Sequence, residues 1–166
     1  MDSPTNSEDS ATATSRHLAG PPDLRFYANY HLVAWQPHGT LDDRLLDEIA
    51  VWLVEIEKVS EPFKRFVDFS QLTTISLQIR HVFDFARDRA KQFAGIGPVR
   101  TALFSQYWVG FGIESLYAGL MENTPIEARA FFNLSEAAKW LGVPAEVLTL
   151  KDTPRPHVGI TPPKTS

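Results

Sequence analysis

Hydrophobic and polar residues follow one another in patterns that predict a series of strands and helices. Runs rich in aromatic and β-branched residues predict strands over 24–30, 32–37, 66–69, 99–104 and 126–132. Apolar residues at helical spacing predict helices over about 40–57, 76–93, 113–121 and 133–142. The order β-β-α-β-α-β-α-β-α predicts a single-domain α/β fold, in which a mixed sheet of about five strands carries about four helices.

Residues that favour helix ends mark the limits of two of these helices. Thr40 and Asp43 have the spacing of a capping box at the start of the first helix. Asn133 with Glu136 predicts the start of the last helix, and Gly142 predicts its end. The connections between the later strands are long enough for right-handed crossovers, so we expect those strands to be parallel.

The predicted strand over 66–69 is apolar on both faces apart from Asp68, which is typical of a central strand. Asp68 and Ser70 then lie near its carboxyl end, where open α/β sheets bind ligands and partners. Gly110 and Gly112, before the next helix, are predicted to lie beside them and to bind a protein or a small anion. A structural alternative exists for each: Asp68 accepts hydrogen bonds from the following loop, and the glycines allow close backbone packing.

Composition bounds the number of domains and the location. The chain has 166 residues, of which 43% are apolar and 11% aromatic, enough for one hydrophobic core. Residues 1–22 and 151–166 have little apolar surface and several prolines, so they predict disordered tails around a domain over 23–150. Because no segment resembles a signal peptide or a membrane span, we expect a cytoplasmic protein.

Charge and residue types exclude several classes of site. A net charge of -4 argues against a nucleic-acid-binding surface. The absence of cysteine excludes thiol nucleophiles, zinc-thiolate sites and iron-sulfur clusters held by this sequence. The five histidines lack the spacing of a metal site. No catalytic triad, carboxylate pair or cofactor fingerprint is present, so we predict no metal, no cofactor and no catalytic residue.

Three segments resemble the STAS-like proteins of the SpoIIAA-like group, relatives of bacterial anti-sigma-factor antagonists. They are VDFSQLTTIS at 67–76, the strand-loop-helix segment at 99–122, and ARAFFNLSEAAKWLG at 128–142. The resemblance implies a mixed sheet with helices packed on it, an arrangement also likened to the lipid-binding CRAL-TRIO fold. It further implies a regulatory module that works through protein contacts, although most members of the group have no assigned activity.

The antagonists carry a phosphorylated serine in a D-S-S-G sequence just after the central strand. When Asp68 and Ser70 are aligned with that region, the four positions fall on residues 76–79. The phosphoserine position then holds Gln78, which has no hydroxyl, and Ser76 lies two positions too early. The resemblance therefore implies that Ser76 and Gln78 belong to a partner-binding face without the phosphate switch.

Two further groups are candidate interaction surfaces. The helix over 76–93 has a basic side, which is either a solvated face with ordinary ion pairs or a docking surface. Its members are Arg80, His81, Arg87, Arg89 and Lys91. Tyr107, Trp108 and Phe111 form an aromatic group before the third helix, and they are either exposed interface anchors or a lid over the core.

Two classes of function follow from these observations. The first is a non-catalytic interaction or regulatory module with a protein partner. The second is a small-ligand binder, with an apolar pocket between the sheet and the helices. The aromatic residues expected around that pocket are Trp52, Phe83, Phe93, Tyr117 and Trp140.

We predict that the kinases of the phosphorylated antagonists leave residues 76–79 unmodified, because Gln78 offers no acceptor oxygen. Mass spectrometry after incubation with such a kinase measures the outcome. Stoichiometric phosphate on Ser76 would contradict this prediction.

Overall fold

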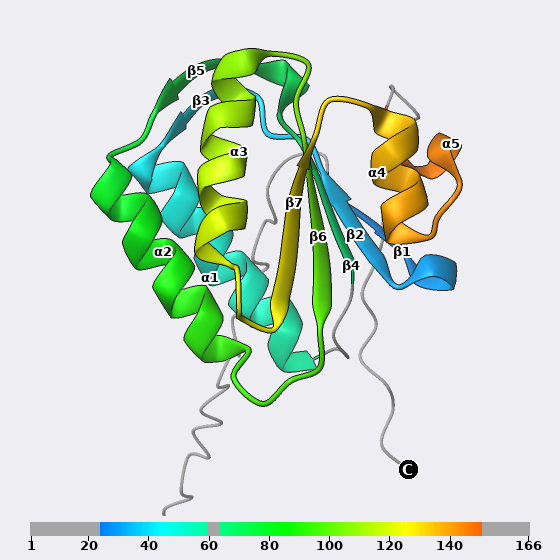
Figure 1. Cartoon of the computed structure of the whole chain (residues 1–166), viewed down its shortest axis with the longest axis horizontal. Coiled ribbons are helices and arrows are strands. Elements are labelled where there is room, and N and C mark those ends of the chain that lie inside the picture. Colours follow the sequence, from blue (N-terminus) through cyan, green and yellow to red (C-terminus); the bar gives the residue numbers. More distant parts are fainter. Residues whose placement is uncertain (1–23, 60–63, 151–166) are drawn as a thin grey trace, which may run out of the picture.

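A five-stranded sheet forms the centre of the computed structural model, which describes residues 24–59 and 64–150 (Figure 1). Both predicted tails lie outside the described residues. The strand order is β1-β2-β4-β6-β7. The strands are β1 (Arg25–Tyr27), β2 (Leu32–Trp35), β4 (Lys64–Asp68), β6 (Val99–Phe104) and β7 (Ile126–Phe131). The first pair is antiparallel and the other pairs are parallel, so the predicted mixed sheet of five strands is confirmed.

The hairpin between β1 and β2 is the predicted opening of the domain. A short 3-10 helix, η1 (Ala28–Tyr30), joins the two strands. His31 follows it with φ 46°, in the left-handed region where a residue can reverse the chain direction. Phe26 is paired with Val33 in the resulting antiparallel ladder.

A second, two-stranded sheet was not predicted. It pairs β3 (Gly39–Asp42) with β5 (Leu72–Ser76) in parallel. Thr40 therefore lies in a strand, and the proposed capping box with Asp43 is wrong. Asp42 instead accepts a hydrogen bond from the backbone N–H of Leu45 at 2.8 Å. Each strand is short and exposed on one side, so neither has the apolar run that marks a buried strand.

Helices cover both faces of the large sheet (Figure 1). One face packs against α1 (Asp43–Val59), α2 (Ile79–Gln92) and α3 (Trp108–Leu120). The other packs against α4 (Leu134–Leu141) and α5 (Ala145–Leu148). The short helix α5 was not predicted. None of the helices in the described part of the chain is long and apolar enough to cross a lipid bilayer.

Side chains of the central strands alternate between these two layers. In β4, Phe66 packs in the core under α4 and α5, and Val67 packs in the core under α1. Ala102 and Leu103 divide in the same way in β6. Both strands are thus buried on both faces, which confirms the prediction of a central strand at this position.

The ends of α4 are the predicted ones. The Asn133 side chain accepts hydrogen bonds from the backbone N–H groups of Ser135 at 2.8 Å and Glu136 at 3.2 Å. Gly142 ends the helix with φ 67°, in the left-handed conformation that glycine adopts without a Cβ clash.

We predict that Asn133→Ala lowers the free energy of unfolding by about 1 kcal/mol, because two amides of the first turn lose their acceptor. Asn133→Asp is the matched control, and it should retain most of the stability because a carboxylate accepts the same bonds. Urea unfolding measures both. Equal losses in the two variants would show that the cap does not act as described.

Candidate functional site at the carboxyl edge of the sheet

The carboxyl ends of the parallel strands place a row of polar and aromatic residues at one edge of the sheet. Asp68 at the end of β4 is level with Phe104 of β6, which is level with Phe131 of β7. Gln36 follows β2 and Ser105 follows β6. The first turn of α3 also lies at this edge, because that helix begins three residues after Ser105.

Asp68 is held by hydrogen bonds within the protein. It is only 6% exposed, and its Oδ1 accepts from the backbone N–H of Ser70 at 2.9 Å. Its Oδ2 accepts from Nε2 of Gln36 at 2.7 Å. The first bond caps the short 3-10 helix η2 (Phe69–Gln71). These contacts match the structural alternative for Asp68, and a binding role for it stays a prediction.

Gly110 and Gly112 do not lie in a loop before the helix, because α3 already begins at Trp108. A Cβ atom at position 110 would lie 2.4 Å from Oγ of Ser105, so any larger residue there would force the Ser105 side chain to move. No atom lies within 4 Å of a Cβ at position 112. The two glycines therefore have different surroundings, and their predicted role in anion binding stays untested.

Ser76 and Gln78 lie apart from this edge. Ser76 is the last residue of β5, five strand residues beyond η2, and a strand of that length spans about 15 Å. Gln78 directly precedes α2, and its backbone N–H donates to Oδ1 of Asp43 at 3.0 Å. The structure therefore brings Asp68, Ser70 and the start of α3 into one region and leaves Ser76 and Gln78 outside it.

Glu114 of α3 is a buried acid that the sequence analysis missed. It is 1% exposed, and neither carboxyl oxygen has a hydrogen-bond partner among the described residues. Burial, together with the charge of Asp68, raises the pKa of Glu114 from 4.5 to about 8. The sequence does contain a signal for this buried acid. Glu114 lies at helical spacing from Gly110 and Tyr117, so it is on the face of the helix that meets the sheet.

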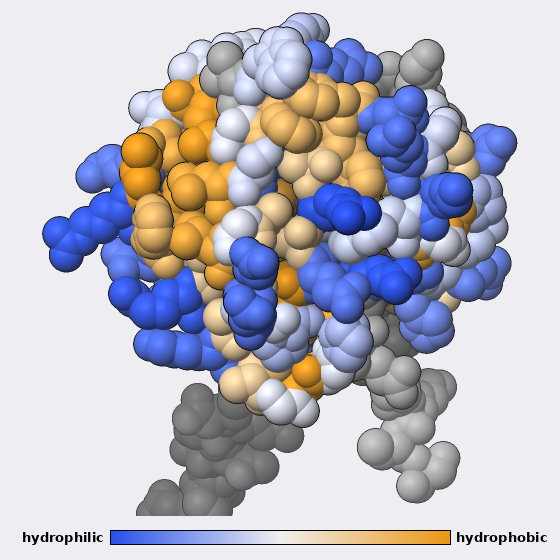
Figure 2. All heavy atoms as spheres, in the orientation of Figure 1, coloured by the Kyte–Doolittle hydropathy of each residue, from blue (hydrophilic) through white to orange (hydrophobic). Residues whose placement is uncertain are grey.

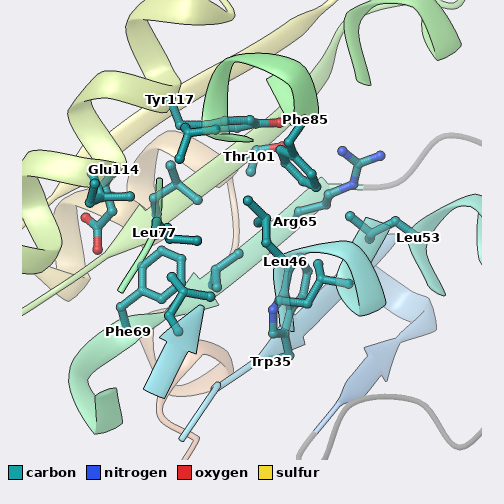
Figure 3. A pocket seen from close by; sticks show the side chains of 16 residues that line it. Trp35, Leu46, Leu53, Arg65, Phe69, Leu77, Phe85, Thr101, Glu114 and Tyr117 are labelled. Carbon is teal, nitrogen blue, oxygen red and sulfur yellow. The ribbon is translucent and has the colours of Figure 1, made fainter. Parts of the chain in front are cut away.

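A cavity of about 80 Å³ lies between the sheet and α1, α2 and α3 (Figure 3). Its wall is mainly apolar, with Leu53, Val67 and Leu103 among its residues. Glu114 lies on one side of it in Figure 3, and Arg65 lies on the other. Apolar side chains from one face of the sheet and three helices thus enclose a space with an ionisable group at each side.

The aromatic residues around this cavity differ from the predicted set. Of that set only Tyr117 lines it, together with Trp35, Phe69 and Phe85. Trp52 packs edge-on against Trp35, with ring centroids 6.0 Å apart. The other three predicted residues lie elsewhere, Phe83 on the surface, Phe93 in the core below α2, and Trp140 on the opposite face of the sheet. Periodicity assigned these rings to helices, but it did not show which way each helix turns toward the sheet.

Two buried arginines and one partly buried glutamate form a group beside the cavity. Arg65 of β4 and Arg89 of α2 are 2% and 1% exposed, and both donate to Oε1 of Glu57. The ring of Phe93 lies 4.8 Å and 5.0 Å from the two guanidinium carbons. Burial lowers the pKa of Arg65 to about 10, and the charge of Glu57 opposes that shift.

Arg89 is therefore not part of an exposed basic side of α2. His81 of that side hydrogen-bonds to Asp47 at 2.8 Å, and Arg87 forms an ion pair with Asp84 at 2.7 Å. The side-chain hydrogen bond to Asp47 raises the pKa of His81. These contacts match ordinary surface pairing, and a docking role for the basic side stays a prediction.

Four aromatic side chains form what we call the aromatic edge cluster: Tyr107, Trp108, Phe111 and Phe132. Trp108 is 80% exposed, Tyr107 60% and Phe132 40%. The rings of Phe111 and Phe132 stack with centroids 3.9 Å apart, and Trp108 lies 4.8 Å from Phe132. Trp108 and Phe111 belong to α3, not to the loop predicted before it. The exposure of Tyr107 and Trp108 matches the first of the two alternatives, exposed side chains, and a role as interface anchors stays a prediction.

Hydrophobic surface extends beside this part of the fold. Figure 2 shows hydrophobic side chains gathered over the upper parts of α2 and α3, whereas hydrophilic ones cover the lower part of α2. Ile79 and Phe83, four residues apart on α2, are 62% and 47% exposed.

No group of three or more histidine, aspartate or glutamate side chains in the described residues could hold a metal ion.

No model of a protein family and no curated protein matches this sequence. Among solved structures, the fold is similar to that of an uncharacterised DUF3478-family protein with a SpoIIAA-like fold from Shewanella loihica PV-4. The two sequences are 18% identical, and the TM-score is 0.44. The similarity covers 66% of this chain and 83% of the Shewanella protein. That protein has the fold that the sequence resemblance implies, and a similarity at this level has no bearing on activity, partner or ligand.

We predict that Glu114→Gln removes part of the pH dependence of stability. The folded protein keeps a proton on Glu114 up to about pH 8, whereas an unfolded glutamate loses it near pH 4.5. The free energy of unfolding therefore falls as the pH rises between these values and levels off above them. At pH 8 the variant should be more stable than the wild type by about 1 to 3 kcal/mol, with a smaller difference at pH 5.

Urea unfolding of both proteins at pH 5 and pH 8 measures this difference. Glu122→Gln, which changes an exposed residue after α3, is the control and should follow the wild type at both pH values. An equal effect of Glu114→Gln at the two pH values would show that Glu114 is already ionised in the folded protein.

Proposed function

We propose that this protein is a non-catalytic interaction module that binds a protein partner through the aromatic edge cluster. The main observation in support is the exposure of Trp108, which is 80% exposed and lies beside other exposed aromatic rings. Tryptophan and tyrosine supply much of the binding energy at protein interfaces, because they bury a large area when a partner covers them.

The arrangement of the cluster supports a binding role. Trp108 meets Phe132 edge-on, and Phe132 stacks on Phe111, so each ring restricts the rotation of the next. The side chains come from the start of α3 and the end of β7, both fixed to the sheet. Rings that already pack on one another, as Trp108, Phe111 and Phe132 do, lose less conformational entropy when a partner covers them.

The polar groups at the edge favour binding over catalysis. Asp68 uses both carboxyl oxygens within the protein, and Oγ of Ser105 donates to the backbone oxygen of Tyr107 at 3.1 Å. A nucleophile needs an adjacent base, whereas the hydrogen bonds described for these two side chains go to Gln36, Ser70 and the backbone of Tyr107. A regulatory role, the absence of catalysis and a cytoplasmic location remain predictions.

We predict that Trp108→Ala weakens binding of the protein that co-purifies from the host cells by about 30-fold or more, the usual effect of removing a central tryptophan. Phe26→Ala is the matched control. Phe26 is also exposed, but it lies on β1, the outer strand at the other side of the sheet from β7. Binding of the purified partner to each variant measures the effect.

A photoreactive amino acid at position 108 or 26 gives a second readout. Cross-links to the partner should form from position 108 and not from position 26. Unchanged affinity in Trp108→Ala, or cross-links from position 26 alone, would contradict the proposed interaction surface.

A further inference from the structure

Four polar atoms around the cavity lack a hydrogen-bond partner among the described residues. They are Nε1 of Trp35, Oγ1 of Thr101 and both carboxyl oxygens of Glu114. The three side chains are 1% to 4% exposed, so bulk solvent does not reach them. An unpaired buried polar group is destabilising, and folded proteins contain few of them. Here they belong to residues of β2, β6 and α3 that line the same cavity.

We propose that the cavity binds a small, uncharged and mainly apolar organic molecule that carries one hydroxyl or amide group. Its apolar part would pack against side chains such as Leu53, Val67 and Leu103. Its polar group would pair with Glu114, which is the strongest unpaired donor and acceptor in the wall when it is protonated. This site lies beneath the helices and is separate from the aromatic edge cluster.

The ionisable groups at the two sides of the cavity favour an uncharged molecule. Arg65 at one side already donates to Glu57, which it shares with Arg89, so it is not a free counterion for an anion. Glu114 at the other side would have to ionise before it could pair with a cation. At pH 7 the raised pKa keeps Glu114 neutral, and burying a charged ligand in an apolar wall without a counterion is costly.

The volume limits the size of the molecule. A cavity of about 80 Å³ is well below the 300 Å³ or more of a drug-sized site, so about five or six non-hydrogen atoms fit. Water alone is the competing occupant, because a polar cavity of this size holds a few ordered waters. The experiment must therefore distinguish displacement of water by an organic molecule from a cavity that keeps its water.

The indole N–H signal of Trp35 in nitrogen-edited NMR spectra of the full chain reports on the cavity directly. Trp35→Phe identifies this signal among those of the four tryptophans. 1-Butanol is the uncharged probe, and butylammonium and butyrate are charged probes with the same four-carbon chain. 1-Butanol should shift the Trp35 signal saturably, with a dissociation constant on the order of 1 mM. Both charged probes should bind at least about tenfold more weakly.

Variants of Glu114 test which atoms hold the probe. Glu114→Leu removes the donor and acceptor and should weaken 1-butanol binding by about fivefold or more. Glu114→Gln keeps both functions and should bind within about threefold of the wild type. Glu122→Gln is the control for an exposed acid, and Trp108→Ala should also leave the affinity unchanged, which separates the cavity from the interaction surface. Cooperative urea unfolding establishes that each variant is folded.

Three results would overturn the proposal. An unsaturable or absent shift of the Trp35 signal would mean that the cavity holds water only. Equal affinity of Glu114→Leu and the wild type would mean that Glu114 does not bind the polar group. Tighter binding of butylammonium or butyrate than of 1-butanol would mean that the site is built for a charged molecule.

Discussion

Burial of β4 and β6 on both faces is the constraint on which the rest of the structure depends. A strand in this position has no solvent-facing side, so its charged groups must lie at its ends or be neutralised inside. Asp68 follows the first course, because it closes β4 and caps η2 at the edge. Arg65 follows the second, because it shares Glu57 with Arg89 beneath the ring of Phe93.

The same constraint explains why both proposed sites lie next to α3. This helix begins at the carboxyl edge, where Trp108 is exposed, and it then passes over the sheet, where Glu114 is buried. Close contact between Gly110 and Ser105 fixes the point at which the helix leaves the edge. One helix therefore supplies an exposed ring to the surface and an unpaired acid to the cavity, and each can be altered without touching the other.

The sequence was sufficient for the large sheet and for the helices α1 to α4 because their signals are local. Double-sided burial of 66–69 and the cap at Asn133 depend on residues close together in the chain. The pairing of β3 with β5 depends on contacts more than thirty residues apart, and both strands are short and partly exposed. The propensity of single residues therefore could not reveal it.

The candidate site could likewise be predicted from the sequence only in part. The position of Asp68 follows from the end of a strand, whereas the sequence left open whether Tyr107 and Trp108 are exposed or fold over the core. The cavity depends on how α1, α2 and α3 turn toward the sheet, which periodicity does not fix. This is why Tyr117 was the single correct residue in the predicted pocket, and why Glu114 was overlooked although its helical position was readable.

Hydrogen exchange of the protein, free and bound to the partner that co-purifies with it, tests most directly whether the start of α3 is the working surface. Backbone amides report local protection over every segment of the domain in one measurement. The partner should slow exchange over 105–111 and 131–133 and leave the hairpin of β1 and β2 unchanged. Protection confined to that hairpin, or to α4 and α5, would contradict it.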